Sequence, residues 1–406
     1  MRRRGEDKDK GEPVDLWFMP WLNLSHEVTV GRVRFVPAET IIQSSDDIQL
    51  KNHITRVLNC CVNEIGEPVT GVAVCRIGDR PGFPELSQDD MIEIRRAKDA
   101  LCFAAILQSS CSMICKGDYG IYSSAQCFDF IRHKASTGSG NFTLHGSNAI
   151  AVNCSYKNYR QNRPFGLSGM APVSTNSIMN ALSKLLISTE TSLKDRVFRS
   201  LEWARLAHDD TGRVSDTSKI VMMATAFEIL LYIGKKKKKK APLMVELDRL
   251  CRSNISECRI DTIDDEDCEF SLMAWWIRDF YKLRNAIVHG DSIDEQELYH
   301  NKPTEDSILI SKLDVADVIM GDYIWRLLCE DDVVGDDCKR LAQFLVEQGA
   351  TLSHTELVKQ WAPRYSGTRE AQLKLGWLKQ NDEDIHPTHS IEFHFTSLDR
   401  DQTTER

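Results

Sequence analysis

Arg284 and His289 are the two side chains in this sequence whose types and spacing best suit chemistry on a phosphate ester. A histidine can accept or donate a proton near neutral pH. An arginine can stabilise the negative charge that develops on phosphate oxygens. No other arginine in the chain is followed by a histidine at a separation of four to six residues. Because roughly one such pair is expected by composition in a chain of this length, the spacing makes Arg284 and His289 candidates for chemistry but does not by itself assign them a catalytic role.

Glu228 is a candidate for holding one of these side chains in place. It is the only charged residue in the apolar segment 220–234. A carboxylate among apolar side chains must find a partner or bind a proton. The nearest plausible cations are Arg278 and Arg284, and Asn285 directly follows the second of them. We therefore expect Glu228 and Asn285 to support the candidate site.

Arg284 and His289 do not meet on a straight helix, where residues five apart point about 140° from one another. They could meet at one phosphate if the helix frays at Gly290, or if two protomers contribute side chains across a two-fold axis. The structural alternative is that Arg284 only pairs with Glu228, and that His289 only interacts with the C-terminal carbonyls of its helix.

Five segments with apolar residues at helical spacing must position these side chains. They are 193–204, 220–231, 243–251, 272–287 and 315–329. The second stops at Gly234 and the fourth just before Gly290, as is typical of a glycine that follows a helix. We therefore expect an all-α helical bundle from about Leu193 to Glu330.

The preceding part of the chain mixes strand and helix patterns, which predicts an α+β domain. Strand patterns cover 26–36, 71–77 and 142–152, and a helical pattern covers 89–109. The segment 158–175 is rich in Pro, Gly, Ser and Asn, which favours a domain boundary. The expected fold class is multidomain α+β, an N-terminal mixed α/β domain followed by the all-α bundle. Its expected parts are a disordered tail at 1–13, the N-terminal α+β domain with linker at 14–175, the bundle at 190–335 and a C-terminal extension at 336–406.

The segment 280–290, Phe-Tyr-Lys-Leu-Arg-Asn-Ala-Ile-Val-His-Gly, resembles the signature of HEPN domains (higher eukaryotes and prokaryotes nucleotide-binding), most closely the ApeA-like group. The segment 224–231, Ala-Thr-Ala-Phe-Glu-Ile-Leu-Leu, resembles the helix with a central glutamate in that group. The resemblance covers about 193–330. It implies a HEPN-like bundle that forms a homodimer, and many HEPN proteins are metal-independent ribonucleases of toxin or antiviral defence systems.

The resemblance leads us to expect a metal-independent endoribonuclease effector of a toxin or antiviral defence system. RNA carries its own nucleophile, the 2′-hydroxyl, so the protein needs to supply only Arg284 and His289, with Asn285 and Glu228 in support. An antitoxin or another defence-system protein is the expected partner. The alternative is a non-catalytic HEPN module that dimerises or binds RNA or a partner protein. Some HEPN toxins carry a regulatory tyrosine two residues after the histidine, where this chain has Asp291.

Basic residues around the same segment are candidates for contacts with the RNA backbone. The net charge of the chain is −9, so any nucleic-acid binding must use local basic patches. A solvated loop is the alternative for the run of six lysines. The expected RNA-binding residues are Lys235, Lys236, Lys237, Lys238, Lys239, Lys240, Arg278 and Lys282.

The composition is that of an ordinary globular protein, with 42% hydrophobic and 27% charged residues among 406. The 13 cysteines include no Cys-x-x-Cys pair, which favours reduced thiols and no metal site. No phosphate-loop motif is present, so we expect no cofactor. The charged first ten residues lack the apolar stretch of a signal peptide, and the longest apolar run is too short to span a bilayer. We expect a cytoplasmic protein.

Overall fold

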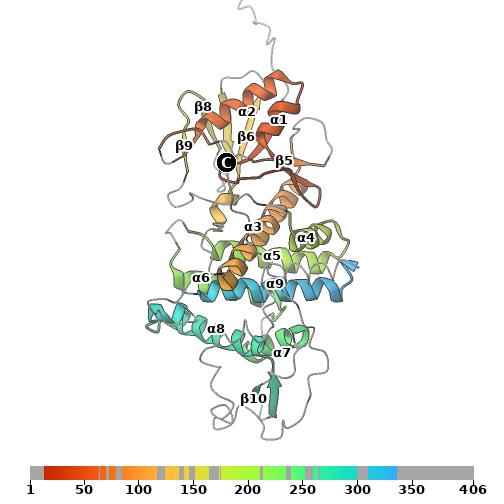
Figure 1. The fold of residues 1–406 in the computed structure, drawn as a ribbon, viewed down its shortest axis with the longest axis vertical. Coiled ribbons are helices and arrows are strands. Elements are labelled where there is room, and N and C mark those ends of the chain that lie inside the picture. Colours follow the sequence, from red (N-terminus) through yellow and green to blue (C-terminus); the bar gives the residue numbers. More distant parts are fainter. Residues whose placement is uncertain are drawn as a thin grey trace, which may run out of the picture. The chain divides into compact units, whose positions relative to one another are not determined.

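The computed structural model describes residues 13–335 with internal gaps. The gaps are 64, 70–72, 79–84, 117–123, 137–140, 146–150, 164–172, 174, 211–213, 235–238, 252–258, 264–265 and 300–309. The chain is of the α+β class, with a sheet in its N-terminal part and helices in most of the rest of the described residues (Figure 1). The predicted tail, apart from Pro13, and the predicted C-terminal extension lie outside the described residues.

Seven of the described strands form one sheet in the order β2-β3-β5-β1-β6-β7-β8, and neighbouring strands run antiparallel. β1 lies in the middle, where Trp17 is paired with Cys75 of β5 and with Arg132 of β6. The strands span Pro13–Met19 (β1), Val28–Val30 (β2), Val33–Pro37 (β3), Ala73–Ile77 (β5), Ile131–Ser136 (β6), Asn141–His145 (β7) and Ala151–Ser155 (β8). A short parallel pair joins β4 (Cys61–Val62) to β9 (Gln161–Asn162).

The strand predictions at 26–36 and 71–77 are confirmed. The first is the β2–β3 hairpin, where Gly31 has a φ of +62° that most side chains disfavour. The second is β5. The single strand predicted at 142–152 is wrong, because β7 and β8 pair with each other as two antiparallel strands. The sequence between them, Gly-Ser-Asn-Ala-Ile, begins with residues that favour turns.

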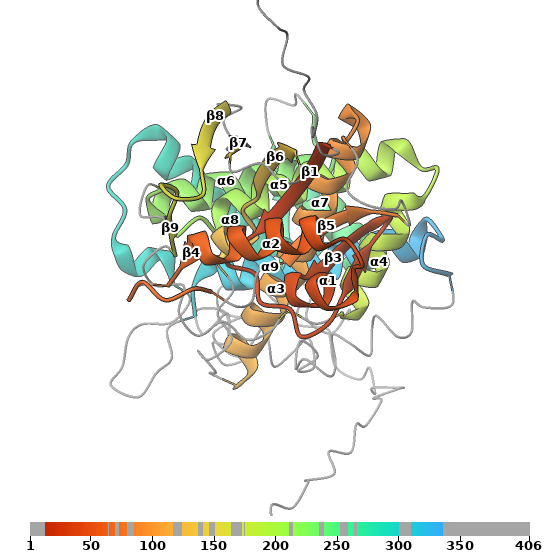
Figure 2. The ribbon, with the colours of Figure 1, turned by 90° about the horizontal axis from the view of Figure 1, so that it is seen from above.

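Helices cover both faces of the sheet. Successive side chains of a strand point to opposite faces, so Leu16 and Phe18 pack with α1 (Ala38–Ser44) and α2 (Ile48–Cys60). Trp17 and Met19 belong instead to the core on the other face, which also contains α3 (Gln88–Lys116). Figure 2 views the molecule from the side of α1 and α2. Because β1 is apolar on both faces, its sequence lacks the alternation by which the other strands were predicted.

The five helices expected after residue 190 are confirmed. They are α5 (Thr191–Ala207), α6 (Asp216–Leu230), α7 (Lys240–Cys251), α8 (Leu272–His289) and α9 (Lys312–Glu330). The prediction that this region is all-α is wrong, since β10 (Arg259–Ile263) and β11 (Glu266–Phe270) form an antiparallel hairpin between α7 and α8. The strand sequence Arg-Ile-Asp-Thr-Ile contains three β-branched residues, which favour strands, and it falls outside the five helical patterns.

The long helix α3 connects the sheet to the later helices (Figure 1). It packs against β2, β3 and β5, and also against α4 (Ser177–Ile187), α5 and α9. One cluster of buried hydrophobic residues includes Phe35 of the sheet, Leu107 of α3 and Phe227 of α6. A division of the chain near residue 175 therefore cuts through a shared core.

A buried polar network joins α3, α9 and the end of α5. Asp317 of α9 is fully buried, and its Oδ1 lies 2.9 Å from Nε2 of His208. The Ser110 hydroxyl donates to Oδ2 of Asp317 at 2.8 Å. Burial by itself would lower the pKa of His208, but the charge and hydrogen bond of Asp317 outweigh it and raise that pKa. The network therefore places a charged pair in the core.

The raised pKa of His208 predicts a loss of stability as pH rises. A group whose pKa is raised on folding contributes stability that is fully present below its unfolded pKa, about 6.5, and lost as pH rises through its folded pKa. In denaturant titrations across this range, the free energy of unfolding should fall more for the wild type than for His208→Gln. The exposed-residue control His26→Gln should follow the wild type, and identical profiles for His208→Gln and the wild type would exclude the charged pair.

Candidate functional site

Glu228 lies at the centre of a polar cluster between α6, α8 and the start of α7. Its side chain is 16% exposed, and Tyr281 Oη donates a hydrogen bond to its Oε1 at 2.5 Å. Arg284 Nη2 lies 3.9 Å from the same oxygen, and Lys239 forms an ion pair with Oε2. The predicted pairing of Glu228 with Arg284 is therefore confirmed, and a half-buried carboxylate holds two cations and a phenol.

Aromatic packing aligns α6 with α8 at this point. The Phe227 ring lies 6.0 Å from the Trp276 ring and 6.2 Å from the Phe280 ring, centroid to centroid. The next residue, Glu228, then faces the following turn of α8. Tyr281 and Arg284 are three residues apart, a spacing that places them on one face of a helix. The Arg284 guanidinium lies 5.3 Å from the Tyr281 ring centroid.

The contacts of the Arg284 guanidinium use only part of its hydrogen-bonding capacity. Its Nη1 donates to Oδ1 of Asn285 at 3.0 Å, so the predicted supporting residue is in contact. The side chain remains 23% exposed, and its buried Nε has no hydrogen-bond partner among the described residues. Burial, followed by the hydrogen bond to Glu228, raises the pKa of Tyr281, which keeps this phenol a donor to the carboxylate. Arg284 is thus fixed on one side and still reachable by solvent.

His289 is the last residue of α8 and is exposed. Its side chain forms no hydrogen bond or ion pair with any other described residue. The Ala286 carbonyl at this helix end accepts instead from the backbone N–H groups of Gly290 and Asp291. The described structure therefore gives no support to the alternative in which His289 only bonds the last carbonyls of its helix.

The helix end does not bring Arg284 and His289 together. α8 continues through His289, and Gly290 ends it with a φ of +81° in the left-handed region. The fraying that could bring the two side chains together within one chain is absent from this described helix. Because they are five positions apart along a regular helix, they diverge by about 140°.

The structure describes four of the other predicted basic residues, which are Lys239, Lys240, Arg278 and Lys282. Lys235, Lys236, Lys237 and Lys238 lie outside the described residues. Lys240 begins α7 and is exposed, while the Lys282 side chain is 57% exposed and lies 3.3 Å from Asp279. Among the described residues of the predicted RNA-binding set, Lys239 has an ion pair with Glu228.

The described contacts of Arg278 are with neighbours on its own helix. Its Nε lies 3.2 Å from Oδ1 of Asp279, and its guanidinium stacks 3.5 Å from the Trp275 ring centroid. These neighbours in sequence offer an ion pair and a cation–π contact on the same helix. Of the two candidate cations, Arg284 is therefore the one with a described ion pair to Glu228.

Tyr281 and Lys239 are members of the cluster whose roles the sequence did not reveal. Tyr281 lies within the motif segment, and its position one turn before Arg284 was an available signal. In the sequence, Lys239 is one of six consecutive lysines. Nothing in that run distinguishes the lysine that folds back onto Glu228, since the contact depends on where α7 begins.

Metal ligands and thiols do not add to this site. Within the described residues, no group of three or more His, Cys, Asp or Glu side chains could hold a metal ion. Burial raises the pKa of the free thiol of Cys61 to about 12, which suppresses its nucleophilic form. Cys329 is disulfide-bonded, contrary to the expectation that the thiols are reduced.

None of the described helices combines the length and the apolar character needed to cross a membrane.

Comparison with known proteins identifies no relative. No protein-family model matches the chain, and neither a curated protein nor a solved structure matches it. The HEPN resemblance therefore rests on the motif residues of α6 and α8.

Removal of the Glu228 carboxylate should destabilise the cluster. Glu228→Ala leaves the Tyr281 hydroxyl and Lys239 without their acceptor and Arg284 without its neighbouring carboxylate, and a hydrogen bond to a charged group contributes about 1.5–3 kcal/mol. We expect a loss of that size in the free energy of unfolding, measured by urea titration. Glu228→Gln keeps an acceptor for Tyr281 and should lose less. The exposed control Glu190→Ala should change little, and an equal, small effect of Glu228→Ala would exclude an organising role for Glu228.

Proposed function

We propose that this chain is a metal-independent endoribonuclease of the HEPN type, acting as a homodimer in a toxin or antiviral defence system. The observation that carries the proposal is the state of two side chains on α8. Arg284 is held by Glu228 and Asn285 but remains partly exposed. His289 is exposed and has no side-chain partner among the described residues. An arginine that is positioned and a histidine that is free fit charge stabilisation and proton transfer respectively.

The proposed reaction uses the nucleophile that RNA itself contains. The 2′-hydroxyl loses its proton to a histidine and attacks the adjacent phosphorus, and the bond to the 5′-oxygen breaks. The leaving 5′-oxygen takes up a proton, so the products are a 2′,3′-cyclic phosphate and a 5′-hydroxyl. Arg284 would stabilise the charge on the non-bridging phosphate oxygens in the transition state. Lys235–Lys240 and Lys282 would contact neighbouring phosphates.

A homodimer follows from the divergence of Arg284 and His289 on α8. Two protomers related by a two-fold axis could contribute one side chain each to the same phosphate. Val288, beside His289, is 51% exposed, and Tyr232, just after α6, is 78% exposed. These apolar side chains are close in sequence to the residues that the second protomer would have to approach.

A second function is favoured by the contacts of Arg284. Because Glu228 and Asn285 already bind its guanidinium, Arg284 could serve only to connect α6 with α8. The chain would then be a non-catalytic HEPN module that dimerises or binds RNA or a partner protein. An antitoxin or defence protein is the expected partner under either function.

His289→Ala should abolish RNA cleavage and leave folding intact. Loss of a general acid–base group lowers the rate by about 10²–10⁴, whereas truncation of an exposed terminal residue changes stability by less than about 0.5 kcal/mol. A gel assay in excess EDTA, with analysis of the cleaved ends, measures both the rate and the expected 2′,3′-cyclic phosphate. His26→Ala, a change at another exposed histidine, is the matched control.

Normal cleavage by folded His289→Ala, or loss of wild-type cleavage in EDTA, would contradict the proposed mechanism. A wild type that binds RNA without cleaving it would favour the non-catalytic module.

The composite site predicts that the protein is at least dimeric at micromolar concentration. Multi-angle light scattering coupled to size exclusion measures this directly. Val288→Asp places a charge beside His289 and should shift the protein toward monomer and lower the cleavage rate in parallel, because unpaired charges are costly in an interface. A monomeric wild type with full activity would exclude a site shared between protomers.

A further inference from the structure

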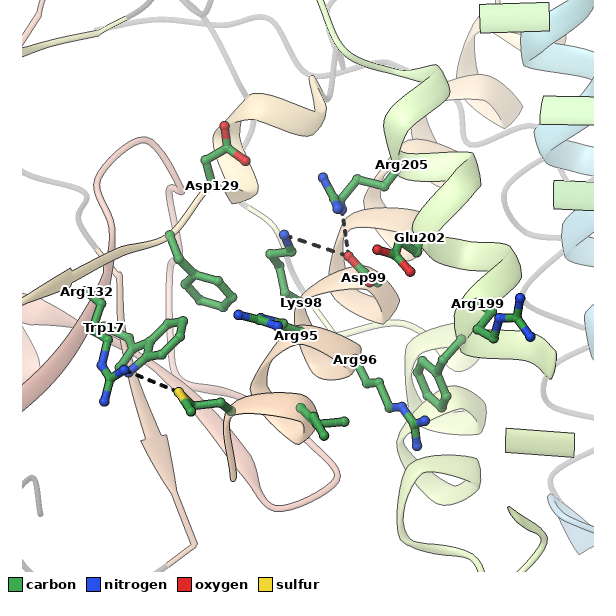
Figure 3. A pocket seen from close by; sticks show the side chains of 14 residues that line it. Trp17, Arg95, Arg96, Lys98, Asp99, Asp129, Arg132, Arg199, Glu202 and Arg205 are labelled. Atoms are coloured by element: carbon green, nitrogen blue, oxygen red, sulfur yellow. Dashed lines mark hydrogen bonds and ion pairs between the residues drawn. The ribbon is translucent and has the colours of Figure 1, made fainter. Parts of the chain in front are cut away.

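A cavity of about 690 Å³ lies between the N-terminal sheet, α3 and α5 (Figure 3). Its volume is within the range of small-molecule pockets, roughly 300–1,000 Å³. β1 contributes Trp17, β6 contributes Arg132, α3 contributes Lys98 and α5 contributes Arg205. None of the lining residues belongs to the candidate ribonuclease site. The cavity is thus a second site, built from four elements that are distant in sequence.

Positive charge dominates the lining of this cavity. Three lining side chains are carboxylates, against six that are cationic. The cations are Arg95, Arg96, Lys98, Arg132, Arg199 and Arg205. In a chain whose net charge is −9, this concentration of cations runs against the overall composition. A cavity lined by one sign of charge concentrates ligands of the opposite sign.

Only some of these cations are neutralised within the protein. Three arginines have carboxylate partners at N–O distances of 2.5–2.6 Å, and these pairs are Arg132 with Asp15, Arg96 with Asp195, and Arg205 with Asp99. Arg95 and Arg199 are exposed and form no ion pair with a described residue. The cavity therefore retains arginines that are available to a ligand.

Lys98 is the cation in the cavity with the least satisfied environment. It is 8% exposed, and its Nζ lies 3.9 Å from Oδ1 of Asp99, beyond hydrogen-bond distance. That carboxylate oxygen already accepts from Arg205 at 2.6 Å, and Figure 3 shows Asp99 between the two cations. No described residue accepts a hydrogen bond from the Lys98 ammonium, which has three donors. Burial, and then the nearby Arg205, lower the pKa of Lys98.

We propose that this cavity binds a small molecule through its phosphate group, with Lys98 contacting the phosphate from within and Arg95 from the rim. Phosphate oxygens would accept the hydrogen bonds that Lys98 does not make within the protein, and their charge would offset the desolvated ammonium. Arginine and lysine both bind phosphate, the first through its fork of N–H groups and the second as a point charge. The site stands independently of the ribonuclease proposal.

The carboxylates of the lining do not prevent anion binding. Asp99 is bonded to Arg205 and lies next to Lys98, so cations outnumber it. Burial raises the pKa of Asp129, which makes its neutral form easier to reach when an anion approaches. Glu202 is exposed on α5, where solvent screens its charge.

The test uses the full chain with inorganic pyrophosphate, ATP and citrate as probes, in thermal melts and isothermal titration calorimetry. Pyrophosphate, ATP or both should raise the melting temperature by about 2–4 °C near saturation, and citrate, which lacks phosphate, should not. Lys98→Met and Arg95→Gln should each weaken phosphate binding at least tenfold. Lys157→Met and Arg160→Gln, exposed residues outside the cavity, are the matched controls and should bind normally.

The melting temperature of Lys98→Met without ligand also shows whether Lys98 contributes to the stability of the fold. Without ligand this variant should melt no lower than the wild type, because it removes a desolvated cation. Equal binding of pyrophosphate and ATP would support recognition of the phosphate group alone, and binding of ATP only would support a nucleotide site. Absence of binding by both, binding that Lys98→Met and Arg95→Gln leave unchanged, or binding only of single-stranded RNA would overturn the proposal.

Discussion

The packing of α3 against both the sheet and the later helices is the constraint on which the arrangement of this protein depends. Its side chains enter the core beneath β2, β3 and β5 and also the core shared with α4, α5 and α9. At Gly321 of α9 a β-carbon would lie 2.7 Å from the end of the Leu107 side chain of α3, so a larger residue there would make Leu107 shift. Because α3 contributes to one core shared by the sheet and the later helices, these elements are held in one packed unit over the described residues.

Two different arrangements of charge follow from this packing. Beside α8, a single carboxylate, Glu228, organises Tyr281, Arg284 and Lys239. Between α3 and α5, the carboxylate of Asp99 faces both Lys98 and Arg205, and of these two cations it is hydrogen-bonded to the arginine. In the first case the carboxylate positions an arginine that stays partly exposed. In the second case the buried Lys98 ammonium has no hydrogen-bond acceptor among the described residues, and an anion from solution could provide one.

α5 is the element that lies between these two arrangements. It contributes Arg199 and Arg205 to the cavity, while the hydroxyl of Ser200 donates to the Ala226 carbonyl of α6 at 3.0 Å. Glu228 is two residues further along α6. The two sites are therefore connected through directly packed helices, each of which is continuous between the residues concerned.

By itself the sequence determined the five helices after residue 190, the Gly31 hairpin and β5, because apolar periodicity and glycine position are local signals. It also identified Glu228 as a carboxylate that must find a cation, with Arg278 and Arg284 as the candidates, but the choice of Arg284 came from the tertiary structure. The tertiary structure decided the rest. β1 is buried on both faces and carries no alternation, and the division of 142–152 into two strands depends on their pairing. The contact of Lys239 with Glu228 depends on where α7 begins, one residue after this lysine. The cavity around Lys98 unites residues from four elements whose proximity depends on long-range packing, which no local pattern encodes.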